Sequence, residues 1–84
     1  MIRDPHSEGE RAFRTFLRQR RKAAGLRQAD LAARLDLPQS FVSKYESGER
    51  LLTFLEALTI LRELGVGVDE VIASLPVDKN ETKS

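Results

Sequence analysis

The chain has 84 residues, no cysteine, a single histidine and a net charge of +1 at neutral pH. This length allows one domain with one core, and it leaves no room for a cleft between domains. The absence of cysteine excludes disulfides and thiolate metal sites, and His6 alone offers little for catalysis. No apolar run approaches the roughly 18 residues of a membrane span, and the N-terminus lacks a signal core. We therefore expect a cytoplasmic, nucleoid-associated protein without cofactor or metal.

The charges divide unevenly along the chain. Residues 1–27 hold eight Lys and Arg against three Asp and Glu, whereas residues 51–84 hold three against six. A basic front part favours contact with a polyanion through one face of the molecule. The same arginines also fit the solvated side of an amphipathic helix, so charge alone leaves both interpretations open.

Helical patterns begin near the N-terminus. The first predicted helix starts after Ser7, which forms a candidate capping box with Glu10, and it continues to Ala24. A shorter helix is predicted over 28–35 from its apolar spacing. Its start is poorly capped, because Arg27 stands where serine or threonine would serve best.

Three more helices follow. One covers about Gln39 to Glu46 and ends before Gly48. The next opens with a capping box at Thr53 and extends to residue 64. The inward side of that helix is predicted to hold Phe54, Ala57, Leu58, Leu61 and Leu64.

The last helix is predicted over 68–75 and ends at Pro76. The chain is thus predicted to comprise a flexible segment over 1–7, one domain over 8–75 and a disordered tail over 76–84. The fold class is all-α, with five helices joined by short loops.

The segment 39–46 carries the strongest functional signal. On a helical wheel at about 100° per residue, its apolar side holds Phe41, Val42 and Tyr45. The opposite side holds Gln39, Ser40, Ser43, Lys44 and Ser47. No carboxylate interrupts that side, and its glutamine, serine and lysine side chains can pair with base edges in a DNA major groove. A serine-rich but idle surface is the alternative.

The preceding helix is consistent with DNA binding. In a helix-turn-helix unit, the N-terminus of the first helix abuts the DNA backbone, where free N–H groups attract phosphate. Gln28 opens this helix and Arg27 precedes it, so both are candidate phosphate contacts.

Two segments of the sequence run from Leu17 to Ala32 and from Pro38 to Arg50. Together they resemble the Cro/C1-type (XRE) helix-turn-helix family of phage repressors and bacterial regulators. The resemblance extends over residues 13–73 and implies a lambda-repressor-like domain whose second and third helices bind DNA.

The resemblance also implies individual roles. The positions that match base-reading residues of the family are Gln39, Ser40 and Lys44. Gln28 and Ser43 match phosphate or groove-edge contacts, and Arg50 matches a backbone contact in the loop that follows. Arg21 and Glu46 match a structural salt bridge between the first and third helices.

Three departures from the family pattern concern loops and helix starts. Arg27 replaces the usual cap, Leu52 replaces a proline, and Gly67 replaces a common serine. None lies on the predicted reading face.

We expect a sequence-specific transcription regulator, a repressor, that binds a palindromic operator in double-stranded DNA as a homodimer. One unit touches few bases, so a dimer is expected, with an interface on the last two helices. Core burial is the competing explanation for each candidate interface residue: Leu51, Leu52, Leu55, Ile60, Val71 and Ile72.

The main alternative is a protein-interaction module, such as an antitoxin-like chain whose acidic second half binds a basic protein. RNA binding is less favoured, because Phe41 and Tyr45 are predicted to point inward and leave no aromatic platform. An enzyme is least favoured, because no nucleophile–base pair, metal cluster or phosphate loop is present.

Overall fold

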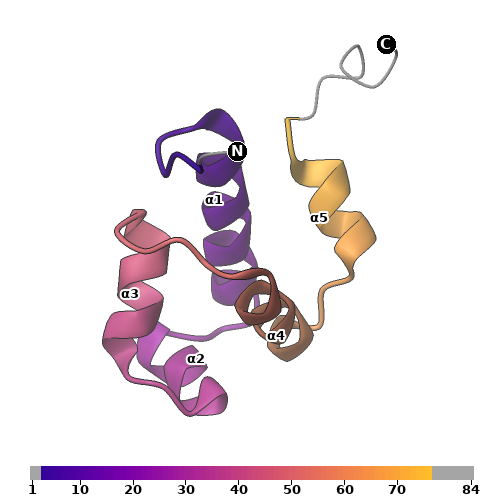
Figure 1. The fold of residues 1–84 in the computed structure, drawn as a ribbon. Coiled ribbons are helices and arrows are strands. Elements are labelled where there is room, and N and C mark those ends of the chain that lie inside the picture. The colour runs from indigo at the N-terminus through magenta and orange to yellow at the C-terminus, as the bar shows by residue number, and fades with distance from the viewer. Residues whose placement is uncertain (1–2, 77–84) are drawn as a thin grey trace, which may run out of the picture.

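The computed structural model describes residues 3–76 and contains five α-helices (Figure 1). They are α1 (Glu8–Ala23), α2 (Gln28–Leu35), α3 (Gln39–Ser47), α4 (Phe54–Leu64) and α5 (Val68–Ser74). The described part of the chain contains no strand, and the predicted all-α class is confirmed. Most of the predicted C-terminal tail, residues 77–84, lies outside the described residues, as do residues 1–2.

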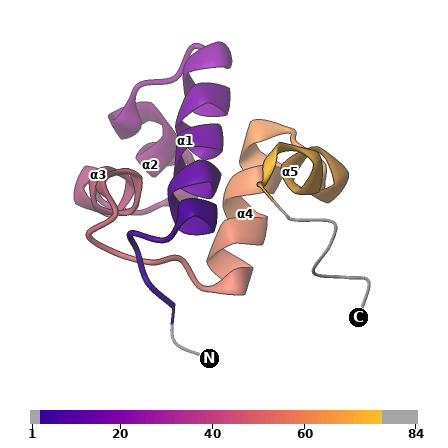
Figure 2. The same ribbon diagram turned by 90° about the horizontal axis from the view of Figure 1, so that it is seen from above.

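The long helix α1 lies in the middle of the molecule (Figure 2). The pair formed by α2 and α3 packs on one side of it, and α4 and α5 lie on the other. A further contact joins α2 to α4. This arrangement leaves one side of α3 facing away from the rest of the domain.

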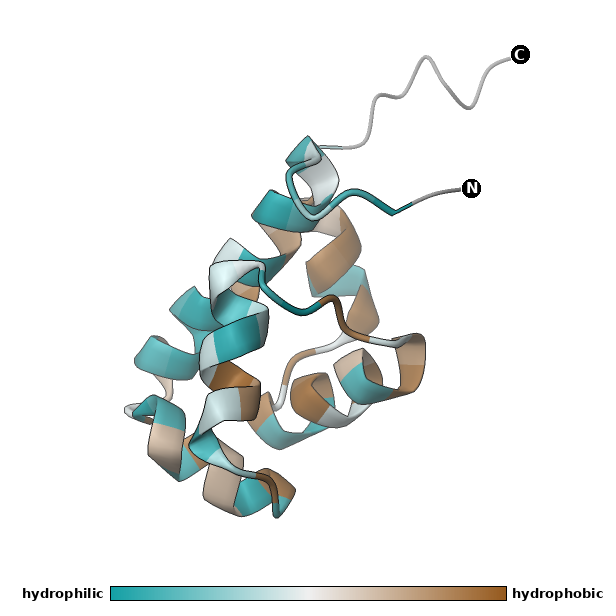
Figure 3. Ribbon diagram, turned by 60° about the vertical axis from the view of Figure 1, so that its left-hand side comes forward, coloured by the Kyte–Doolittle hydropathy of each residue, from teal (hydrophilic) through white to brown (hydrophobic). Residues whose placement is uncertain are grey.

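The core takes one apolar stripe from each helix, and each helix carries both hydrophobic and hydrophilic stretches (Figure 3). The largest fully buried side chains are Tyr45, Leu17, Leu31, Ile60 and Val42. Burying an aliphatic side chain of this size contributes about 1.5–3 kcal/mol. The core therefore depends most on the places where α1, α2, α3 and α4 meet.

The structure decides two expectations about apolar residues. Among the candidates for a dimer interface, Leu52, Ile60 and Val71 are buried in the core, which is the competing explanation. The expectation that Phe54 faces inward is wrong, because it is 75% exposed at the start of α4.

The starts of α4 and α1 are capped in two different ways. At α4, Thr53 and Glu56 form both halves of the predicted capping box. At α1, the Ser7 hydroxyl accepts from the Glu10 N–H at 3.2 Å, but the Glu10 carboxylate binds Arg3 instead of reaching back. The predicted box at α1 is thus only half formed, because a nearby guanidinium is the stronger partner for that carboxylate.

The turn between α2 and α3 ends α2 at Asp36, which has a φ of 58°. Aspartate tolerates this left-handed conformation better than most residues other than glycine. At the other end of α3, Gly48 has a φ of 88°, and a Cβ there would lie 2.9 Å from the Arg14 guanidinium carbon. The positive φ favours glycine at this position, whereas the Arg14 guanidinium is the end of a flexible side chain and could shift to admit a Cβ.

Within residues 3–76, none of the helices is both long enough and apolar enough to cross a membrane.

Candidate DNA-binding site

The exposed side of α3 carries the residues that were predicted to read DNA bases. Gln39, Ser40 and Lys44 are exposed, and Ser43 is half-buried beside them. On the opposite side, Val42 and Tyr45 are buried in the core. The apolar half of the helix therefore fixes it to the domain and leaves the carboxylate-free half open to solvent.

A buried ion pair anchors the last turn of α3. The Arg21 guanidinium donates to both carboxylate oxygens of Glu46, at 2.7 and 3.0 Å, and a third N–H donates to the Leu26 carbonyl at 2.7 Å. The two side chains are 7% and 4% exposed. The pair that the resemblance implied is present, and it joins α1, the α1–α2 loop and α3.

Gln28 connects this ion pair to the exposed face. Its side-chain amide N–H donates to Glu46 at 3.0 Å, and its carbonyl oxygen accepts from the Gln39 amide at 3.5 Å. Because an ionised carboxylate can only accept, the nitrogen of the Gln28 amide must face Glu46. Its oxygen then faces Gln39. The orientation of Gln28 thus follows from the charge on Glu46.

Arg27 begins α2 and is paired with Asp30. Its guanidinium donates to the two Asp30 oxygens, each at 3.1 Å, and its backbone N–H donates to the same carboxylate at 2.8 Å. These contacts lower the pKa of Asp30 to about 2. Asp30 therefore forms one half of a capping box by accepting the N–H of the N-cap residue, whereas the Arg27 guanidinium has no acceptor with which to form the other half.

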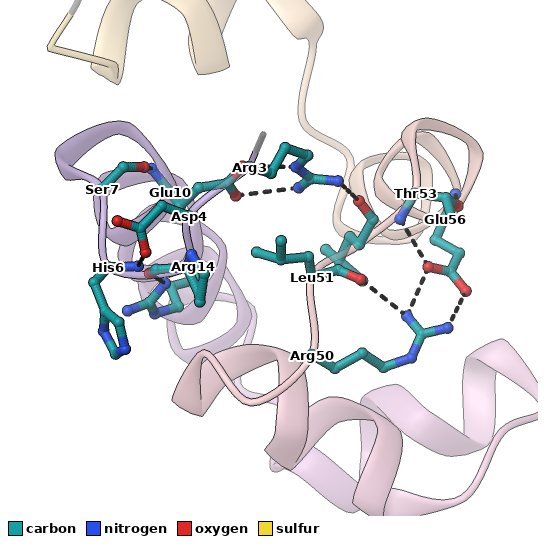
Figure 4. Close-up of polar contacts among 12 residues, drawn as sticks. Arg3, Asp4, His6, Ser7, Glu10, Arg14, Arg50, Leu51, Thr53 and Glu56 are labelled. Atoms are coloured by element: carbon teal, nitrogen blue, oxygen red, sulfur yellow. Dashed lines mark hydrogen bonds and ion pairs between the residues drawn. The ribbon is translucent and has the colours of Figure 1, made fainter. Parts of the chain in front are cut away.

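Arg50 lies in the loop before α4 and is also paired with a carboxylate, that of Glu56 in α4 (Figure 4). Its guanidinium donates to the two Glu56 oxygens at 2.7 and 2.8 Å and lies over the Phe41 ring, 4.8 Å from the centroid. The Arg50 guanidinium and the Thr53 N–H lower the pKa of Glu56 to about 2. The arginine and the helix start thus share one carboxylate.

The segment before α1 is tied to the rest of the domain (Figure 4). The Arg3 guanidinium donates to the Leu52 carbonyl at 2.7 Å and to Glu10 at 2.8 Å. Arg14 donates to the Pro5 carbonyl at 2.6 Å. These bonds hold the segment, which was predicted to be flexible, against α1 and the α3–α4 loop.

The structure therefore gathers the predicted residues into two groups. Gln28, Gln39, Ser40, Ser43 and Lys44 lie together on the open side of α2 and α3. Arg27, which precedes Gln28, and Arg50, in the loop after α3, form the second group, each paired with a carboxylate. Asp30 and Glu56 were not predicted as partners of these arginines, although both stand three residues after a helix N-cap.

The comparison with protein families agrees with this arrangement. A family described as helix-turn-helix matches residues 17–71, which is more than half of the chain. The chain belongs to this helix-turn-helix family, of the Cro/C1 (XRE) type. It is a DNA-binding protein of the class that regulates transcription. A comparison with curated proteins gives no significant match.

Proposed function

We propose that the protein is a repressor that binds a palindromic operator as a homodimer, with one α3 in each of two successive major grooves. The half-sites would lie about 34–36 Å apart, one turn of DNA. The observation that carries the proposal is the exposed, carboxylate-free face of α3, held from behind by the buried Arg21–Glu46 pair. Such a protein acts in the cytoplasm, on the nucleoid.

In this proposal the two groups of residues have different tasks. The base edges are read by Gln39, Ser40 and Lys44. The phosphates are bound by Arg27, Gln28, Ser43 and Arg50. Base contacts set the sequence preference, whereas phosphate contacts set the register on the duplex and the dependence on salt.

Substitution of the reading residues tests this proposal. Once an operator has been selected from random duplex DNA, Lys44→Ala should raise its Kd about 5- to 150-fold, because a base contact contributes about 1–3 kcal/mol. Gln39→Ala should act similarly at a different base pair. Electrophoretic mobility shifts measure both effects, and a repeated selection with Lys44→Ala should show relaxed preference at one position.

Arg62→Ala is the matched control, because Arg62 is an exposed cation on α4. It should change operator binding little. Unchanged binding by Lys44→Ala and Gln39→Ala would show that α3 is not the reading helix.

Exposed apolar residues on α4 and α5 support the homodimer. Phe54 and Leu55 are 75% and 73% exposed, and Val68 and Ile72 are also exposed. Phe54 and Val68 border a groove of about 470 Å³ between the start of α1, α4 and α5. Exposed apolar residues around a groove of this kind are typical of interaction sites in small proteins. We assign it to a second copy of the chain.

Phe54→Asp is expected to abolish the dimer, because a buried aromatic anchor contributes about 2 kcal/mol or more to an interface and an unpaired carboxylate adds a further cost. Sedimentation velocity should show a dimer for the unaltered protein and a monomer for this variant. Thr15→Asp, on the exposed side of α1, is the control and should remain dimeric.

A monomer in every sample, with and without operator, would contradict the homodimer. The same apolar surface would then favour the second candidate function, a module that binds a different protein.

A further inference from the structure

Arg27, at the start of α2, and Arg50, in the loop after α3, are bound in the same way. Each guanidinium donates two N–H groups to one carboxylate, Arg27 to Asp30 and Arg50 to Glu56. Each carboxylate also accepts the N–H of a helix N-cap residue, at 2.8 and 2.9 Å. A single arrangement therefore occurs twice, at the starts of α2 and α4.

We propose that Asp30 and Glu56 are internal competitors of DNA phosphate. In the free protein they occupy the guanidinium groups of Arg27 and Arg50, and in the complex the phosphates of the duplex replace them. The proposal rests on the proposed function, because it takes Arg27 and Arg50 to be phosphate contacts.

The chemistry of the guanidinium supports the competition. Its planar fork of N–H groups binds carboxylate and phosphate with the same bidentate geometry. The donors that Asp30 and Glu56 use are thus the donors that a phosphate would need. In the observed arrangement, Arg27 and Arg50 cannot offer their full set of donors to DNA.

The exposure of the pairs shows why they can exchange partners. The side chains of Arg27 and Arg50 are 82% and 40% exposed, in contrast to the buried Arg21. Ion pairs in contact with solvent contribute little to stability and are screened by salt, so a phosphate can replace the carboxylate at small cost. The Arg21–Glu46 pair has no such access and remains structural.

The caps determine what happens to the carboxylates after the exchange. Asp30 is held by the Arg27 N–H and Glu56 by the Thr53 N–H, so neither leaves when its arginine does. A negative charge then stays beside each arginine–phosphate contact. Both the lost pairing and this remaining charge weaken binding to any duplex, whatever its sequence.

The proposal is tested by variants that remove the negative charge of Asp30 or Glu56 but keep the hydrogen bond to the N-cap N–H. Asp30→Asn and Glu56→Gln keep a side-chain carbonyl that can accept the N-cap N–H, but they bind arginine more weakly. Each should tighten binding up to about fivefold at 0.1 M salt, because the exposed ion pair that DNA must break in the unaltered protein contributes up to about 1 kcal/mol. The gain should shrink at higher salt, which screens that pair. Fluorescence anisotropy over a range of salt concentrations measures both quantities.

Two duplexes of equal length and composition separate this inference from the proposed function. The gain should be the same on the selected operator and on a scrambled duplex, because phosphates carry no sequence information. If the unaltered protein prefers neither duplex, the proposed function fails. If it prefers the operator but the variants bind like the unaltered protein, only the competition is overturned.

Two controls test the mechanism. Glu63→Gln makes the same change in net charge at an exposed position of α4, and it should give a clearly smaller gain. In an Arg27→Ala background, Asp30→Asn should lose most of its effect, since the competition requires the guanidinium. Equal gains from Glu63→Gln and Asp30→Asn, or weaker binding by Asp30→Asn and Glu56→Gln, would overturn the proposal.

Folding is checked separately by thermal unfolding of each variant. Glu56→Gln and Asp30→Asn affect different helices, so either one alone tests the inference if the other variant does not fold.

Discussion

Glu46→Ala is expected to destabilise the protein by about 3–5 kcal/mol, because it leaves the Arg21 guanidinium charged and unpaired in the domain interior. Arg21 is 6% exposed, and it would retain only the Leu26 carbonyl as a hydrogen-bond partner. Gln28 would lose its acceptor as well. Small domains have free energies of unfolding of about 5–15 kcal/mol in total, so this single change should remove much of the stability.

Urea unfolding followed by far-UV circular dichroism measures this effect. Glu49→Ala is the matched control, since Glu49 is exposed and close in sequence, and it should change the free energy of unfolding by less than about 0.5 kcal/mol. The double variant Arg21→Met, Glu46→Leu should recover part of the loss, because no charge remains buried. Equal effects of Glu46→Ala and Glu49→Ala would show that the ion pair does not anchor α3.

Leu17→Ala is the second change with a large expected effect. Leu17 lies on α1, is fully buried and belongs to the core that joins the two halves of the domain. Removing a buried leucine side chain costs about 2–5 kcal/mol, from the lost apolar burial and the cavity that remains. The midpoint of unfolding in urea should fall accordingly, with little change in slope.

Leu55→Ala is the same substitution at an exposed position and provides the comparison. At concentrations where the protein is monomeric, it should leave the free energy of unfolding almost unchanged. If Leu17→Ala and Leu55→Ala lowered the free energy of unfolding equally little, α1 would not pack at the centre of the domain as described.

The helix order could be predicted from the sequence because local signals mark most helix ends. The Thr53–Glu56 capping box begins α4, and Gly48 and Gly65 adopt the positive φ that ends α3 and α4. These signals act between neighbouring residues, so they need no knowledge of the tertiary structure. The division of α3 into a buried and an exposed side followed from periodicity for the same reason.

Burial on α4 and α5 could not be predicted as well, because it depends on how the helices pack. Ile60 and Phe54 both lie on apolar surface of α4, but Ile60 meets the core and Phe54 faces an open groove. The spacing of apolar residues along α4 indicates how wide its apolar surface is. It does not show which part of that surface a neighbouring helix covers.

The partners of Arg27 and Arg50 were missed for a different reason. The positions of Arg27 and Arg50 indicated phosphate contacts, and these contacts remain a prediction. The structure adds Asp30 and Glu56 as partners in the free protein. The signal was available, because a carboxylate at the third position of a helix commonly reaches back to the chain before it.

The uneven anchoring of α3 affects the thermodynamics of recognition. Its last turn is fixed by Tyr45, which is buried in the core, and by Glu46, which binds Arg21 of α1. Its first turn follows Pro38 and has no side-chain cap. The rotamers of Tyr45 and Glu46 are thus restricted when the protein folds. Those of Gln39, held only by the 3.5 Å contact with Gln28, and of the exposed Ser40 become more restricted in the DNA complex. Binding should therefore carry its largest side-chain entropy loss in the first turn of α3, where the helix can adjust to the base pairs that it meets.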